Sequence, residues 1–136
     1  MNDHLNLNWN SYKENIGNSL KDLRESKDFF DVTLACEDEQ IECHKVVLSA
    51  CSPLMLKILR QNNHPHPLLY LKGVKFSHLL SLIDFMYDGQ VNVSQKDLMS
   101  FMATAEEMKI KGLTRSGEFD GQGIVIHVKI RIFYTL

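Results

Sequence analysis

The chain has 136 residues, of which 44% are hydrophobic and 24% are charged, a composition typical of one compact globular domain rather than a disordered chain. Its 15 basic and 17 acidic residues give a net charge of −2, without the clustered positive charge that direct binding to nucleic acid requires. The sequence also has no apolar run of the roughly 18 residues that a membrane helix needs, no pattern of a secretory signal, and an odd number of cysteines, three, which fits a reducing compartment better than a disulfide framework.

The first predicted elements are a short strand and an amphipathic helix. Three apolar residues, Leu5, Leu7 and Trp9, alternate with asparagines at a period of two, which predicts a half-buried strand. Apolar residues then recur at helical spacing over residues 12–25, with Ser11 as the N-cap.

A β-hairpin and a pair of short helices are predicted next. Strand-forming residues over 29–36 are followed by an acidic turn, and residues 40–43 alternate back, which indicates a hairpin. Apolar residues then cover nearly all sides of a helical segment, which is typical of a buried helix. Ser52 and Pro53 form an N-cap and N1 pair that divides this segment into helices over about 45–51 and 53–61. We expect this helical hairpin to form the centre of the core.

The next predicted pair is a strand and a helix. Residues 68–71 follow a loop with two prolines and are predicted to form a strand. A second apolar stripe at helical spacing runs from Phe76 to Tyr87, and Gly89 is placed to end this helix.

A short strand over residues 91–93 and a last helix complete the predicted domain. Ser94–Asp97 resembles a capping box and is expected to open a helix whose apolar face includes residues from Leu98 to Met108. The Met and Phe residues on this helix are expected to face the core, with a groove for a partner as the alternative. Gly112 is expected to end the helix.

The chain changes character after residue 115. Three glycines in eight residues predict a Gly-rich linker over 116–123, and strict alternation over 124–134 predicts a strand. We therefore expect a domain over 1–115, the linker, and a strand-like tail over 124–136. Three interpretations of the tail stay open: addition to a sheet edge within or between chains, an aggregation-prone strand, or an alternative splice end outside the domain.

The predicted α+β order carries stretches that resemble a known family. Residues 31–34 (DVTL), 44–53 (HKVVLSACSP) and 85–93 (FMYDGQVNV) together resemble the BTB/POZ family, whose fold is a helical cluster flanked by a short mixed sheet. Residues 5–10 (LNLNWN) are similar to the extra N-terminal strand of the Tramtrack group of insect transcription factors. Residues 111–113 resemble the end of that group's domain.

The resemblance implies a homodimer that exchanges N-terminal elements, and higher oligomers formed through the extra strand. The sequence agrees with such an exchange, because the N-terminal strand and amphipathic helix have no obvious packing partner in so small a domain. The expected dimer interface consists of Leu5, Leu7, Trp9, Tyr12, Ile16, Leu20 and Leu23.

The resemblance also implies a charged pocket at the dimer interface. Asp31 and Lys45 occupy the corresponding positions, and co-regulator peptides would dock there. The alternative for these two residues is a structural ion pair, or helix-end charges at a strand–helix junction.

The chain offers little support for metal binding or catalysis. Cys36, Cys43, His44 and Cys51 lack the short Cys-x₂₋₄-Cys unit that structural zinc sites favour. Cys51 lies in an apolar helix and is expected to be buried rather than reactive. No phosphate-binding, nucleophile-elbow or zinc-protease motif is present, so we expect no cofactor and no enzyme activity.

The sequence therefore predicts an interaction module of a nuclear transcription regulator. Its expected partners are itself, other BTB proteins and transcriptional co-regulators, and it would reach DNA only through another segment or partner. No membrane contact is expected. The alternative function is a substrate adaptor for a cullin ubiquitin ligase. Such adaptors usually carry further helices after the domain, whereas a Gly-rich linker and a strand follow here.

Overall fold

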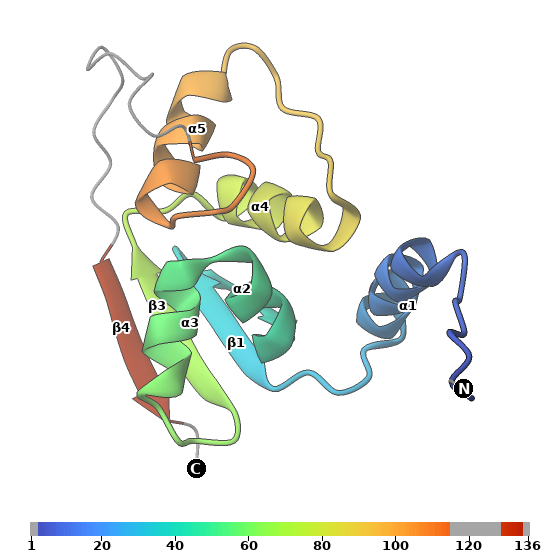
Figure 1. Cartoon of the computed structure of the whole chain (residues 1–136). Coiled ribbons are helices and arrows are strands. Elements are labelled where there is room, and N and C mark those ends of the chain that lie inside the picture. Colours follow the sequence, from blue (N-terminus) through green and yellow to red (C-terminus); the bar gives the residue numbers. More distant parts are fainter. Residues whose placement is uncertain (1–2, 115–128, 135–136) are drawn as a thin grey trace.

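A computed structural model describes residues 3–114 and 129–134, which contain five helices and four strands (Figure 1). The elements in chain order are α1 (Tyr12–Ser26), β1 (Val32–Cys36), β2 (Glu39–Cys43), α2 (Lys45–Cys51), α3 (Pro53–Arg60), β3 (Pro67–Lys72), α4 (Phe76–Asp88), α5 (Leu98–Glu107) and β4 (Lys129–Tyr134). The predicted α+β fold, a helical cluster beside a small mixed sheet, is confirmed. The predicted linker over 116–123 and the start of the predicted tail strand lie outside the described residues.

The four strands form one mixed sheet in the order β2-β1-β3-β4. β1 pairs antiparallel with β2 through the predicted hairpin, and parallel with β3. Parallel neighbours need a crossover connection, and here α2 and α3 supply it. β4 pairs antiparallel with the outer side of β3, so it forms one edge of the sheet (Figure 1).

The core lies between the sheet and the helices. Buried apolar side chains of β1, β2, β3 and of α2 to α5 make up this core, because inward-facing strand residues and one face of each helix supply them. Leu20 of α1 packs against its surface. The largest fully buried side chains are Phe101, Leu34, Leu48, Met55, Leu69, Leu71, Leu79, Leu82, Ile83, Met108, Ile110 and Val32. The predicted place of the α2–α3 hairpin in the core is confirmed by the burial of Leu48 and Met55.

The turn between α2 and α3 is fixed by Ser52. This residue is fully buried, and its Oγ accepts a hydrogen bond from the Met55 N–H at 3.1 Å. The same hydroxyl donates to the Met108 carbonyl at 2.7 Å, just after α5. Ser52 therefore caps α3, with Pro53 as its first residue, and also joins the crossover to the end of α5.

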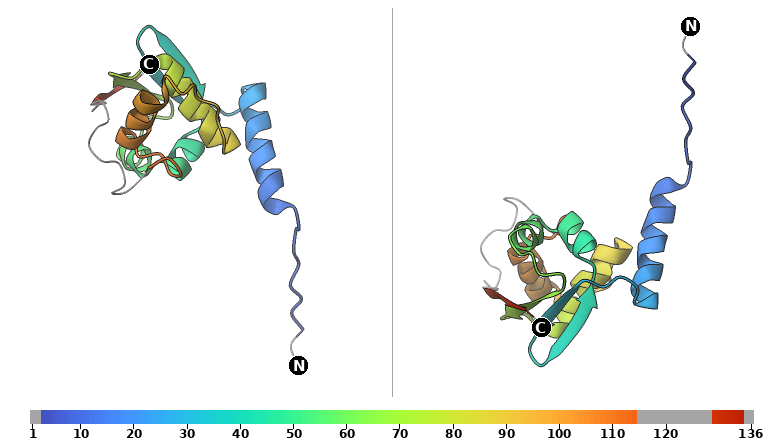
Figure 2. Two further views of the ribbon diagram at one scale, coloured as in Figure 1. Left: turned by 90° about the horizontal axis from the view of Figure 1, so that it is seen from above. Right: turned by 90° about the horizontal axis from the view of Figure 1, so that it is seen from below.

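The predicted N-terminal strand does not form within the chain. Residues 3–9 carry no strand pairing, and Leu5 and Leu7 are 88% and 89% exposed. Figure 2 shows this segment and α1 projecting from the rest of the domain. A strand requires a partner backbone, and the described chain places none beside this segment, so the alternating pattern yields only an extended chain.

The predicted strand over 91–93 and the predicted helix start at Ser94 are also wrong. Val91 and Val93 are partly buried against the core without any strand ladder, so their alternation reflects burial alone. Ser94 Oγ donates to the Asp97 carboxylate at 2.9 Å inside a turn, and α5 begins only at Leu98. Leu98 was predicted on the core-facing side of this helix, but it is 44% exposed.

We predict that Ser52→Ala destabilises the fold by about 1–3 kcal/mol, because it removes a helix cap and leaves the buried Met108 carbonyl unpaired. Urea unfolding of the full chain measures this loss. Ser19→Ala, at an exposed position of α1, is the matched control and is expected to change stability by less than about 0.5 kcal/mol. Equal stability of the two variants would contradict the role given to Ser52.

Candidate functional site

The described surface has its largest run of exposed apolar side chains at the N-terminal segment and the first half of α1. Leu5, Leu7, Trp9, Tyr12 and Ile16 are all more than 40% exposed. The Trp9 and Tyr12 rings meet edge to face, with 5.3 Å between their centroids. Contiguous apolar side chains of this kind on a small domain mark an interaction surface rather than scattered surface residues.

The second half of α1 lies against the domain. Leu20 is partly buried against the core cluster, and Leu23 is also half-buried. These two residues therefore belong in part to the packing of α1 on α4, whereas the other five predicted interface residues remain exposed.

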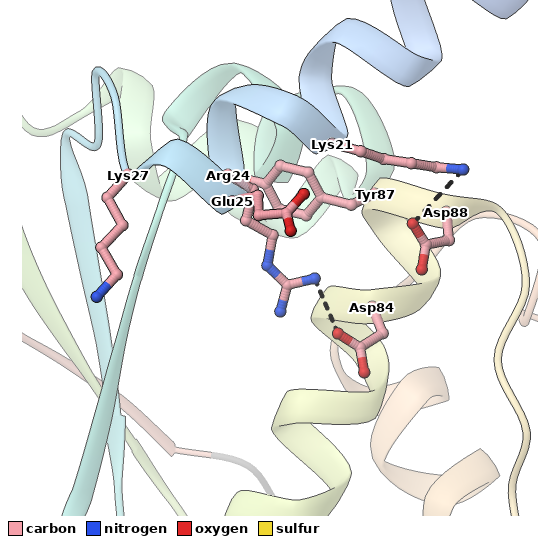
Figure 3. Close-up of a pocket in the computed structure, with 7 residues that line it drawn as sticks. All are labelled: Lys21, Arg24, Glu25, Lys27, Asp84, Tyr87 and Asp88. Atoms are coloured by element: carbon pink, nitrogen blue, oxygen red, sulfur yellow. Dashed lines mark ion pairs between the residues drawn. The ribbon is translucent and has the colours of Figure 1, made fainter.

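Charged side chains reinforce the contact between α1 and α4 (Figure 3). Arg24 forms an ion pair with Asp84 at 2.8 Å, and its guanidinium lies 5.0 Å from the centre of the Tyr87 ring. Lys21 lies 3.7 Å from Asp88. These side chains line an open hollow of about 520 Å³ together with Glu25 and Lys27. Three acidic and three basic groups balance each other there, so the hollow has no preference for an anion or a cation.

A buried hydrogen-bond network holds the segment between α1 and β1 against the core. His44 Nε2 lies 2.7 Å from the Asp28 carbonyl, which can only accept, so Nε2 carries the proton. His44 Nδ1 therefore accepts from the Tyr87 hydroxyl, and the His44 backbone N–H donates to the same oxygen at 3.1 Å. Burial raises the pKa of Tyr87 to about 12, so the hydroxyl stays protonated and donates.

The structure brings Asp31 and Lys45 together through the main chain. The Asp31 carboxylate accepts the Lys45 backbone N–H at 2.7 Å, at the first residue of α2. The Lys45 ammonium instead donates to the His64 carbonyl at 2.8 Å. These bonds correspond to the helix-end alternative for this pair, because the carboxylate satisfies a free N–H at a helix N-terminus. The charged pocket at a dimer interface stays a prediction.

The three thiols are poor nucleophiles. Burial raises the pKa of Cys36 from 9.0 to about 11 and that of Cys43 to about 12, and it also raises the pKa of Cys51. Cys51 was expected to be buried and is half-buried, and its thiol points to the Met86 carbonyl at 3.8 Å. Since thiolate is the reactive form, none of these thiols is activated for attack at neutral pH.

The described residues contain no cluster of three or more His, Cys, Asp or Glu side chains arranged to hold a metal ion. Cys36, Cys43, His44 and Cys51 are thus not brought together as a metal centre. Within the same residues, no helix has the length and apolar character needed to cross a membrane.

Sequence reasoning missed Arg24, Asp84 and Tyr87 as the residues that position α1. Arg24 follows Leu20 by four residues, which places both on one helix face, so the spacing carried a signal for Arg24. Its partners lie 60 and 63 positions further along the chain, and no local pattern connects them.

Comparison with known proteins settles the family. The BTB/POZ domain pattern matches residues 20–121, three quarters of the chain. The chain belongs to the BTB/POZ family. This family membership makes it a protein–protein interaction module, and it confirms the resemblance seen in residues 31–34, 44–53 and 85–93.

Relatives in Drosophila melanogaster extend the match. The chain is 46% identical to sex determination protein fruitless over 114 residues. The aligned region covers 84% of this chain and 12% of fruitless. The chain is 46% identical over 110 residues to longitudinals lacking protein-like, covering 81% and 87% of the two chains. Identity to the alpha isoform of protein tramtrack is 43% over 108 residues, which are 79% of this chain and 13% of tramtrack. The chain thus spans about an eighth of fruitless and of tramtrack, and the expected likeness to the Tramtrack group is confirmed.

A solved structure confirms the fold. The BTB domain of zebrafish PATZ1 superposes with a TM-score of 0.72, covering 81% of this chain and 91% of that one. Sequence identity is 19%, so this likeness shows a shared architecture.

We predict that stability falls as the pH rises above 9. The unfolded thiols ionise near their ordinary pKa of 9.0, whereas folded Cys36 and Cys43 keep their protons up to about pH 11 and 12. Each buried thiol then lowers the free energy of unfolding by up to about 1.4 kcal/mol per pH unit across this window. Below pH 9 the contribution is fully present.

Urea unfolding at several pH values between 8 and 10.5 measures this slope. Cys43→Ala is expected to reduce the slope, whatever its effect on stability at pH 8, since it removes one ionising group. An unchanged slope in this variant would show that Cys43 does not titrate differently in the two states.

Proposed function

We propose that this BTB/POZ domain joins copies of its own chain through residues 3–16 and the exposed face of α1. The exposure of Leu5 and Leu7, at 88% and 89%, is the observation that carries the proposal. Transfer of apolar surface out of water stabilises by roughly 25 cal/mol per Å². A second copy that covers this segment gains that stabilisation, which the single chain cannot obtain.

The backbone of the segment supports the same proposal. Residues 3–9 are extended and form no strand ladder within the described chain. Main-chain N–H and C=O groups in this state are suited to pairing with a strand of another chain. The alternation of Leu5, Leu7 and Trp9 would place apolar side chains on one face of such a strand and asparagines on the other.

The anchoring of α1 makes the segment a defined surface rather than a loose tail. Packing of Leu20, together with the contacts of Arg24 to Asp84 and Tyr87, fixes the C-terminal half of the helix on α4. The N-terminal half then projects with Tyr12 and Ile16 exposed (Figure 2). A held helix loses less conformational freedom on binding than a disordered one, which favours association.

The family and the relatives support a proposed role in the cell. The chain acts as the association module of a transcription regulator in the nucleus, pairing with itself and with other BTB proteins and recruiting co-regulators near Asp31 and Lys45. DNA is reached through another segment or partner, because the chain carries a net charge of −2. A non-catalytic role is part of this proposal, and the poorly activated buried thiols support it.

The cullin-adaptor alternative gains nothing from the structure. That function would lead us to expect further helices after the domain. In the part of the chain that the structure describes, α5 is followed by turns up to residue 114 and then by β4.

We predict that Ile16→Glu disrupts self-association of the full chain. The wild-type chain is expected to show at least twice its 15.7 kDa mass by light scattering behind size exclusion. A carboxylate buried in an apolar interface without a partner costs several kcal/mol, so the dissociation constant should rise by about a hundredfold or more. Circular dichroism should show that the variant remains folded.

Leu80→Glu is the matched control, because Leu80 on α4 is 37% exposed against 41% for Ile16 but lies outside the proposed surface. It is expected to keep the wild-type mass. A wild-type chain that stays at 15.7 kDa at micromolar concentration, or an Ile16→Glu variant that still assembles, would overturn the proposal.

A further inference from the structure

β4 covers one complete edge of the sheet. It pairs antiparallel with β3 at six consecutive positions, from Pro67 opposite Tyr134 to Lys72 opposite Lys129 (Figure 1). The other side of β3 pairs in parallel with β1. β3 is therefore an interior strand only because β4 is present. Of the three interpretations of the tail, this arrangement corresponds to the one in which the tail adds to a sheet edge within its own chain.

The part of the chain that matches the family does not include β4. That match ends at residue 121, and β4 begins at Lys129. Without β4 the sheet would have the order β2-β1-β3, with β3 as an edge whose outward N–H and C=O groups lack partners. Pro67 at the start of β3 fits a strand of this kind, because proline is tolerated at the first residue of an edge strand.

The register shows what kind of strand this edge accepts. Ile132 lies opposite Leu69 and Ile130 opposite Leu71, and both of these β3 residues are fully buried. Arg131 lies between the two isoleucines, opposite the half-buried Tyr70. The edge therefore accepts an extended segment in which apolar and basic residues alternate.

Two features make β4 an exchangeable occupant. β4 is connected to Thr114 only through residues 115–128, which contain three glycines. Among the described elements, β4 makes extensive contacts with β3 alone. The register also places Lys129 directly opposite Lys72, and like charges at opposed positions weaken the pairing at that end.

We propose that the outer edge of β3 is a strand-acceptor site for a second copy of this chain, whose β4 can replace the chain's own. Both copies carry the same sequence, so exchange reproduces the same register and every backbone bond of the ladder. The chain's own β4 competes at an effective concentration on the order of millimolar. Exchange is therefore favoured where copies are concentrated.

This surface is separate from the N-terminal one. Figures 1 and 2 place β4 and α1 on opposite sides of the domain. None of residues 3–23 takes part in the pairing of β3 with β4, so the two proposals can fail independently. With two distinct surfaces for its own copies, the chain can build assemblies larger than a dimer.

A labelled peptide of residues 128–136 tests the acceptor site. The receptor is the full chain with Ile132→Pro, because a proline inside a strand removes a ladder donor and keeps the chain's own β4 from closing the edge. The peptide should bind this variant at one site, measured by fluorescence anisotropy. It should bind the wild-type chain at least about tenfold more weakly, since the wild-type edge is open for only a small fraction of the time.

Two controls separate strand pairing from other binding. A peptide with proline at position 132 should not bind either chain, and Ile16→Glu combined with Ile132→Pro should bind the normal peptide as well as Ile132→Pro alone. Equal binding of the wild-type chain and the Ile132→Pro variant, or binding of the proline peptide, would overturn the proposal.

Hydrogen exchange of the wild-type chain decides the matter if Ile132→Pro fails to fold. If β4 is exchangeable, its backbone amides should exchange at least about tenfold faster than those of β1, such as the amide of Leu34. Protection of the β4 amides equal to that of β1 would show that β4 opens only with the whole domain, and would overturn the proposal.

Discussion

The parallel pairing of β1 with β3 is the constraint on which the rest of the fold depends. Parallel neighbours cannot be joined by a tight turn, so the chain must cross over the sheet, and it does so through α2 and α3. Ser52 makes this crossover compact by capping α3 and binding the Met108 carbonyl. With β1 and β3 held at the centre, β2 covers one side, and the outer side of β3 becomes the place where a further strand adds.

The sequence predicted those parts of the fold whose signals are local. Pro53 placed the boundary between α2 and α3, and Gly89 placed the end of α4, where its φ of 78° is one that glycine adopts without strain. Alternation was less reliable. It gave no strand within the single chain at 5–9 and none at 91–93, because a period of two reports which residues are apolar and not whether a partner backbone lies beside them.

Contacts between distant residues account for what could not be predicted in the site. The motif around Asp31 and Lys45 was visible in the sequence, but not that the carboxylate binds the Lys45 backbone N–H rather than its ammonium. The network that joins Asp28, His44 and Tyr87 depends on separations of 16 and 43 residues. Such a network depends on the assembled core, in which a buried polar group must find whichever partner the fold brings near.

On the proposed function, residues 3–9 become a strand only when a second copy is present. Hydrogen exchange of the Leu5–Trp9 amides in the full chain, at several protein concentrations, tests this directly. These amides should exchange slowly at concentrations where the chain assembles, and fast on dilution or in Ile16→Glu. Fast exchange of these amides at every concentration, in a chain whose β1 amides stay protected, would contradict it.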